Sequence, residues 1–136
     1  MEIILAENHG FCYGVKRAVE MANEAAEGKG KSYTLGPIIH NPQVVGRLES
    51  KGVSPIQEVA DIDEGTMIIR SHGVGPAIYA EAEEKGLHIL DATCPHVKKA
   101  QQDAKSVIED GMTLVILGEK NHPEVKSINL WANNKG

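Results

Sequence analysis

Short apolar runs alternate with longer segments of helical periodicity along most of the chain. Apolar runs of four or five residues that end in turn residues are typical of buried strands. Such runs lie at residues 2–6, 32–35, 67–70, 88–92 and 113–117. A loop with Gly, Pro or His follows each run. This strand–loop–helix order, repeated about five times, predicts an α/β fold with mainly parallel sheets.

The segments between these runs predict four helices. Between Val15 and Ala26 the apolar residues recur at every third or fourth position, and Gly28 ends the pattern. Residues 118–124 are predicted to be the exit loop of the last strand. The other helices are expected from Asn41 or Pro42 to Leu48, from Ala77 to Lys85, and from Pro95 through Ile108.

Composition narrows the classes of protein that need to be considered. Apolar residues make up 41% of the 136 residues, which is enough for a packed core. The net charge of −5 and an aromatic content of 4% argue against a nucleic-acid partner, which requires clustered cations or stacking rings. No run approaches the ~20 apolar residues of a membrane span. We therefore expect a cytoplasmic protein without a membrane partner, whose local pockets can still attract a small anion.

Five chemically reactive side chains share one position in the predicted pattern. Cys12, His40, His72, Cys94 and His122 each follow a predicted strand. Ligands of parallel α/β sheets bind outside the carboxyl ends of the strands, so these residues are expected at the same edge. The helices that follow also direct their amino termini there, and helix amino termini favour anions.

Each of these side chains, taken alone, has two interpretations. Free cysteines are most often small buried hydrophobes, but thiolates at strand-to-helix turns can also hold an iron–sulfur cluster. Single histidines are usually ordinary loop residues, but several together can clamp a diphosphate. Glu124, two residues after His122, is either a solvated carboxylate or an acid that protonates a leaving hydroxyl.

Five stretches of the chain, in order, resemble the 4-hydroxy-3-methylbut-2-enyl diphosphate reductase family. One stretch alone would be a weak signal, whereas five in register are highly specific. They are Gly10-Phe11-Cys12-Tyr13-Gly14-Val15-Lys16-Arg17-Ala18, Ile39-His40-Asn41, Ser71-His72-Gly73-Val74, Asp91-Ala92-Thr93-Cys94-Pro95 and Asn121-His122-Pro123-Glu124-Val125.

The resemblance implies an iron–sulfur oxidoreductase of the non-mevalonate isoprenoid pathway. It implies a [4Fe–4S] cluster held by three cysteines, of which Cys12 and Cys94 match the first two. The implied reaction is the two-electron removal of a hydroxyl group from the allylic diphosphate, which yields isopentenyl and dimethylallyl diphosphate and water. The implied electron donor is a ferredoxin or a flavodoxin.

The resemblance also implies roles for the histidine loops. His40, His72 and His122 would bind the diphosphate, and Glu124 would donate a proton to the substrate hydroxyl. A diphosphate bound remotely from the reacting carbon can orient that carbon through its binding energy.

The family's fold consists of three similar α/β units around the cluster. By this resemblance, residues 1–14 and 95–136 are expected to form part of the first unit and residues 15–94 the second unit. The third unit and the third cysteine ligand are expected beyond residue 136, so we expect this chain alone to have little or no activity. Two alternatives stay open: a non-catalytic anion-binding α/β domain, and a zinc hydrolase that uses Cys12, Cys94 and one histidine.

Overall fold

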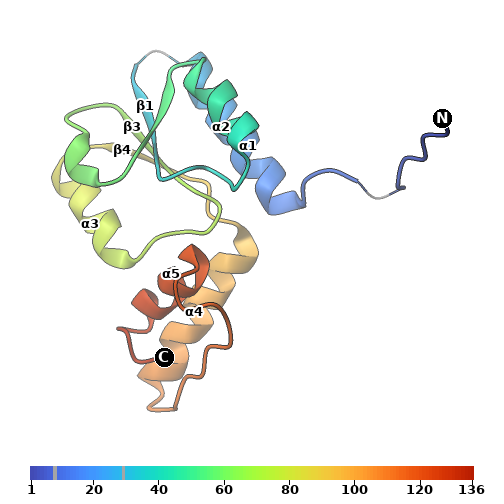
Figure 1. Ribbon diagram of the computed structural model, residues 1–136. Coiled ribbons are helices and arrows are strands. Elements are labelled where there is room, and N and C mark those ends of the chain that lie inside the picture. The colour runs from blue at the N-terminus through green and yellow to red at the C-terminus, as the bar shows by residue number, and fades with distance from the viewer. Residues whose placement is uncertain (8, 29) are drawn as a thin grey trace.

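The computed structural model describes residues 1–7, 9–28 and 30–136 (Figure 1). The helices are α1 (Tyr13–Glu27), α2 (Pro42–Glu49), α3 (Pro76–Glu84), α4 (Pro95–Glu109) and α5 (Pro123–Trp131), with a short 3₁₀ helix η1 (Val59–Asp61). The strands are β1 (Ser32–Leu35), β2 (Val53–Ile56), β3 (Thr66–Ile69) and β4 (His88–Asp91).

The four strands form one parallel sheet in the order β2-β1-β3-β4. The α/β fold with parallel strands is therefore confirmed. Met67 of β3 lies opposite Tyr33 of β1 on one side and Ile89 of β4 on the other. Parallel neighbours need a crossover connection, and α2 and α3 supply two of these connections. The carboxyl ends of β1, β3 and β4 consequently lie side by side.

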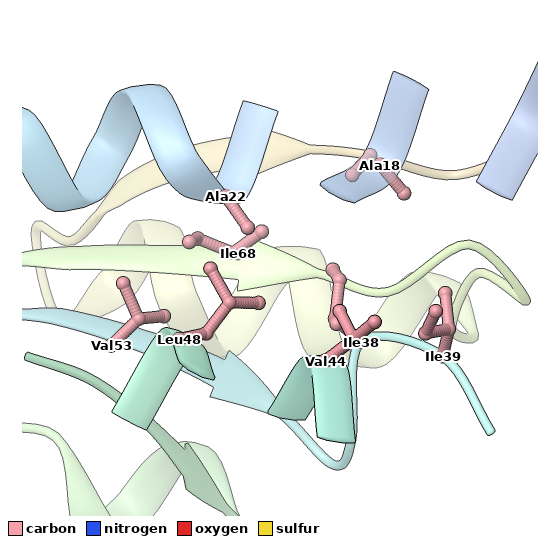
Figure 2. Close-up of a cluster of buried hydrophobic side chains, with 9 residues drawn as sticks. Ala18, Ala22, Ile38, Ile39, Val44, Leu48, Val53 and Ile68 are labelled. Carbon is pink, nitrogen blue, oxygen red and sulfur yellow. The ribbon is translucent and has the colours of Figure 1, made fainter. Parts of the chain in front are cut away.

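Helices cover both faces of the sheet. The side chains of β3 alternate between the two faces and therefore pack against helices on each side. Ile68 packs on one face with Ala18 and Ala22 of α1 and with Leu48 of α2. Figure 2 shows Ala22 and Leu48 pointing toward Ile68 from opposite sides, with Ala18 further along α1. Met67 and Ile69 point to the opposite face, where η1 and α3 lie. All three β3 side chains are fully buried, so the sheet forms the middle layer of the core.

The helices predicted from periodicity are confirmed within a few residues of their bounds. Pro42, Pro76 and Pro95 each occupy the first turn of a helix. Proline suits this position because its missing N–H has no helical partner there. None of the helices in residues 1–7, 9–28 and 30–136 is long and apolar enough to cross a membrane.

Two of the predicted strands are wrong. Residues 2–6 and 113–117 form no strand, and their large apolar side chains are mostly exposed, with Ile4 at 82% and Val115 at 83%. A strand requires a neighbour that satisfies its backbone N–H and C=O groups. Neither segment pairs with the sheet, which contains only β1 to β4 in the described part of the chain. The apolar character of a short segment is therefore not sufficient to predict a strand.

Three elements of the described residues were not predicted, namely β2, α5 and the short 3₁₀ helix η1. Strand β2 contains Pro55, which argues against a central strand, and β2 indeed lies at the edge of the sheet. Helix α5 begins at Pro123, inside the segment predicted to be an exit loop. The Asn-His-Pro-Glu sequence carries a helix-start signal, because proline occupies the first position and an acidic residue the second.

Candidate functional site

Backbone hydrogen bonds join the loops that follow β1, β3 and β4. The N–H of Ser71 donates to the carbonyl of Ile38 at 3.5 Å, and the Ser71 hydroxyl donates to the same carbonyl at 3.4 Å. The N–H of Cys94 donates to the carbonyl of Ser71 at 2.9 Å. These bonds keep the three loops side by side in the same order as the strands β1, β3 and β4 that precede them. They fix His40, His72 and Cys94, each within two residues of a bonded position, relative to one another.

The structure brings the three predicted histidines into one cluster. The ring centroids of His40 and His72 lie 4.6 Å apart, those of His72 and His122 lie 5.5 Å apart, and those of His40 and His122 lie 6.0 Å apart. One nitrogen from each ring lies within 4.8 Å of the others. His40 is exposed, whereas His72 and His122 are half-buried.

His122 reaches this cluster by a different route from the one predicted. It does not follow a strand; it caps the amino terminus of α5. Helix α5 packs on α4, and a buried hydrogen bond from Gln101 Nε2 to Ser127 Oγ (2.5 Å) connects the two helices. Because α4 begins directly after Cys94, this packing delivers His122 to the edge where the strand loops end.

The surroundings of His72 change the pKa of its imidazole. Burial, the neighbouring His40, Arg70 and His122 together lower the pKa of His72 from 6.5 to about 4. Its Nδ1 atom is buried without a hydrogen-bond partner among the described residues. The imidazole of His72 is therefore neutral at neutral pH.

This pKa predicts how the stability of the protein depends on pH. The unfolded chain binds a proton at His72 more readily than the folded chain, so acidification destabilises the fold. The stability is fully present above pH 6.5 and is lost as the pH falls toward about 4. We expect the melting temperature of the wild-type protein to fall more steeply across this window than that of His72→Asn. The control is His96→Asn, at an exposed position outside the cluster; equal slopes in all three proteins would contradict the prediction.

The two cysteines are free, and each caps a helix. Cys12 precedes α1 and is exposed, and Cys94 precedes α4 and is partly buried. Each cysteine occupies the N-cap position of its helix, and neither side chain makes a cap hydrogen bond. Helix amino termini in general favour anions. An ideal Cβ placed on Gly14 would lie 2.4 Å from Cys94 Sγ, so the Cys94 thiol rests against the first turn of α1. The structure therefore brings Cys94 close to the loop that carries Cys12.

Sequence reasoning missed the residues that hold the Cys94 loop. The guanidinium of Arg17 in α1 donates to the carbonyls of Thr93 (3.3 Å) and Asp91 (3.5 Å). The Asp91 carboxylate accepts from the Thr93 N–H (2.9 Å), from Lys98 Nζ (2.6 Å) and from the Tyr79 hydroxyl (3.0 Å). Burial alone would raise the pKa of Asp91, but the hydrogen bonds from Lys98 and Thr93 outweigh burial and lower it.

Arg70 was also missed, although its position at the end of β3 is a signal that could have identified it. Burial lowers the pKa of its guanidinium. Its Nε is buried and has no partner among the described residues. Its Nη1 occupies the space that a side chain on Gly36 would fill, since an ideal Cβ there would lie 2.7 Å away. Arg70 thus places a cation close enough to His72 to lower the pKa of that ring.

Glu124 lies beside the histidine cluster, in the first turn of α5. Its backbone N–H donates to His122 Nδ1 at 3.2 Å, and its side chain is half-buried. A pocket lined by Phe11, His40, Ser71 and His72 extends from the histidines toward the loop that carries Cys12. The histidine cluster therefore lies beside the first turn of α5 and next to the loop that precedes α1.

A comparison with protein families identifies the chain. The model of the LytB protein family matches residues 3–136. The chain belongs to the LytB family.

The curated relatives that match the chain are named 4-hydroxy-3-methylbut-2-enyl diphosphate reductase. The 4-hydroxy-3-methylbut-2-enyl diphosphate reductase of Geotalea uraniireducens (strain Rf4) is 53% identical over 135 residues, which cover 99% of this chain and 48% of that protein. The reductase of Geobacter sulfurreducens is 54% identical over 132 residues, which cover 97% and 47% respectively. The chain thus spans about half the length of the curated relatives it matches.

Solved structures of LytB reductases share the fold. A structure of (E)-4-hydroxy-3-methyl-but-2-enyl diphosphate reductase, described as the terminal enzyme of the non-mevalonate pathway, matches with a TM-score of 0.85 at 48% identity. That match covers 97% of this chain and 47% of the solved chain. The corresponding reductase from Plasmodium falciparum matches with a TM-score of 0.90 at 33% identity, over 95% and 41% of the two chains.

Proposed function

We propose that this chain is the part of a 4-hydroxy-3-methylbut-2-enyl diphosphate reductase that binds the diphosphate and carries two of the cluster ligands. The reaction is the two-electron removal of the allylic hydroxyl, which gives isopentenyl and dimethylallyl diphosphate and water. The observation that supports this proposal best is the meeting of His40, His72 and His122 beside Glu124. The names of the relatives support the same reaction.

The two cysteines fit an iron–sulfur cluster. Cys12 and Cys94 are free thiols at helix amino termini, and thiolates are the usual ligands of such clusters. The absence of a side chain on Gly14 leaves space at Cys94 Sγ. A [4Fe–4S] cluster held by these residues and a third thiolate would supply electrons and Lewis acidity to the allylic oxygen. We place residues 15–94 in one α/β unit of the reductase, and residues 1–14 and 95–136 in another.

The histidines are proposed to hold the diphosphate. Their rings come from three separate loops, so they can contact an anion from three directions. A neutral imidazole donates one N–H, and an imidazolium donates a stronger, charge-assisted hydrogen bond. Burial lowers the pKa of His72 most, and repulsion from His40, Arg70 and His122 lowers it further; the negative charge of a bound diphosphate would oppose that repulsion. Arg70, close behind His72, adds positive charge to the same region.

Glu124 is proposed to deliver the proton that converts the departing hydroxyl into water. The first turn of α5 fixes its backbone, whose N–H donates to His122 Nδ1. Proton transfer from a positioned carboxyl group contributes about 10²–10⁴-fold to many reactions. The electrons would come from a small soluble donor such as a ferredoxin or a flavodoxin, which implies a cytoplasmic setting.

Titration with inorganic diphosphate in a buffer that contains a metal chelator tests the binding proposal. Loss of one charge-assisted hydrogen bond costs about 1.5–3 kcal/mol, so we expect His40→Ala to weaken the affinity at least about tenfold. Calorimetry gives the dissociation constant directly. The control His96→Ala changes an exposed histidine outside the cluster and should leave the affinity unchanged. Absence of binding to the wild-type chain, or equal affinity in His40→Ala, would count against the proposal.

A further inference from the structure

Three imidazoles at this spacing are suited to two opposite ligands. One nitrogen from each ring lies within 4.8 Å of the others, which is close to the arrangement of a three-histidine metal site. The same rings can instead surround an anion. Because a neutral imidazole has one N–H and one lone pair, the outcome depends on which nitrogen carries the proton. A metal needs lone pairs directed at the centre, and an anion needs N–H groups there.

The structure settles this choice for His122. Its Nδ1 accepts a hydrogen bond from the backbone N–H of Glu124 at 3.2 Å. A nitrogen that accepts a hydrogen bond carries no proton, so in the neutral ring the proton resides on Nε2. Nδ1 is occupied by the cap, and Nε2 is a donor. Neither nitrogen of His122 then offers a lone pair to a metal ion.

The helix itself maintains this tautomer. Pro123, the first residue of α5, has no N–H, so the N–H of Glu124 is the first free donor of the helix. His122 is the residue at the cap position and satisfies that donor. If the proton moved to Nδ1, two N–H groups would face each other and the cap would be lost. Metal binding at Nε2 would therefore have to break the start of α5.

The buried Nδ1 of His72 is consistent with the Nε2–H tautomer in that ring as well. This atom has no hydrogen-bond partner in the part of the chain that the structure describes. A buried N–H without a partner is rarer in proteins than an acceptor without one. The tautomer with the lone pair on Nδ1 and the N–H on Nε2 is therefore favoured for His72, because it leaves no buried N–H without an acceptor. The hydrogen bond of His122 and the burial of His72 Nδ1 thus favour the same tautomer in two of the three rings.

We propose that the backbone N–H of Glu124 holds His122 in the Nε2–H tautomer, so that the histidine cluster accepts anions and rejects divalent transition metals. This inference deepens the proposed function, because it explains how a cluster with metal-like spacing favours a diphosphate. It assigns Glu124 a positioning role through its backbone, in addition to the role proposed for its carboxyl group.

The first test is nitrogen-15 NMR of the histidine rings above pH 6.5, in the chain without an iron–sulfur cluster and without any ligand. We expect the His122 signals of the Nε2–H tautomer in the wild-type protein and in Glu124→Ala, which keeps the backbone N–H. Glu124→Pro removes that N–H at a helix position that tolerates proline, so we expect a mixture of tautomers there. An Nδ1–H tautomer in the wild-type protein would overturn the proposal, as would an unchanged tautomer in a folded Glu124→Pro.

The second test uses Co²⁺ as the probe, in a Cys12→Ser/Cys94→Ser background that removes the thiol ligands. We expect Glu124→Pro to bind Co²⁺ at least about tenfold more tightly than Glu124→Ala, since both lack the carboxylate and only one lacks the N–H. Tight Co²⁺ binding by the parent that is lost in His122→Asn would overturn the rejection of metals. Should Glu124→Pro not fold, the wild-type tautomer and the parent's Co²⁺ affinity still decide the question. Failure of diphosphate binding would refute the proposed function without changing the tautomer result.

Discussion

Replacing Gly14 with alanine should remove iron and acid-labile sulfide from protein that is reconstituted anaerobically with a small thiol as the third ligand, while the sheet stays folded. The added Cβ would lie 2.4 Å from Cys94 Sγ and 2.9 Å from Cys94 Cβ. Rotation of the Cys94 side chain would move the sulfur, but Cβ is fixed to the backbone. Either α1 or the Cys94 loop must therefore shift, at an overpacking cost of about 1–3 kcal/mol. A ligand displaced in this way no longer meets the cluster that we place at Cys12 and Cys94.

Gly46 provides the matched control for this substitution. It lies inside α2, and an ideal Cβ there meets no atom within 4 Å. Gly46→Ala should raise stability by about 0.5–1 kcal/mol, because alanine is the better helix former, and should leave iron and sulfide unchanged. A thiol-labelling experiment in a Cys12→Ser background gives a second measurement, in which Cys94 should react faster in Gly14→Ala. Wild-type levels of iron and sulfide in Gly14→Ala would refute the placement of the cluster at Cys94.

Local sequence patterns predicted α1 to α4 and three of the four strands in the described residues, because periodicity and proline positions act over a few residues. The pattern could not distinguish a strand from an apolar segment without a partner, as residues 2–6 and 113–117 demonstrate. Strand β2 was missed for the opposite reason. Its Pro55 argues against a strand, yet an edge position tolerates proline.

The candidate site shows the same division between local and distant causes. His40 and His72 could be placed together because they follow strands that were predicted correctly. His122 was assigned to the same edge, but it arrives there on α5, through packing on α4 that no local pattern reveals. The roles of Arg17 and Asp91 depend on contacts with residues that are distant in sequence or on the opposite side of a loop. Both residues lie in stretches that resemble the reductase family, but their residue types are common on surfaces, and neither the pattern nor the resemblance assigned them a role.

The histidine cluster should also respond to a glycine that carries no chemistry. Gly73 follows His72 and has a φ of +70°, a conformation that alanine adopts only with strain of about 1–3 kcal/mol. Its added Cβ would lie 2.4 Å from Gln101 Nε2, 2.9 Å from Thr93 Cγ2 and 3.2 Å from Ser127 Oγ. Gln101 and Ser127 form the buried hydrogen bond that connects α4 to α5. Gly73→Ala therefore pushes against the contact that positions His122.

Gly111→Ala separates backbone strain from this packing effect. Gly111 has a nearly identical φ of +72°, and an ideal Cβ there meets no atom within 4 Å. The two variants share the backbone strain, so the difference between their free energies of unfolding isolates the packing contact of Gly73→Ala. We expect this contact to cost about a further 1–3 kcal/mol. Urea unfolding measures both values. In buffer where Gly73→Ala is still folded, its affinity for diphosphate should fall below that of Gly111→Ala, because His122 moves away from His72. Equal stabilities of the two variants would mean that α4 and α5 yield freely at this point, and equal affinities would mean that the position of His122 does not depend on their packing.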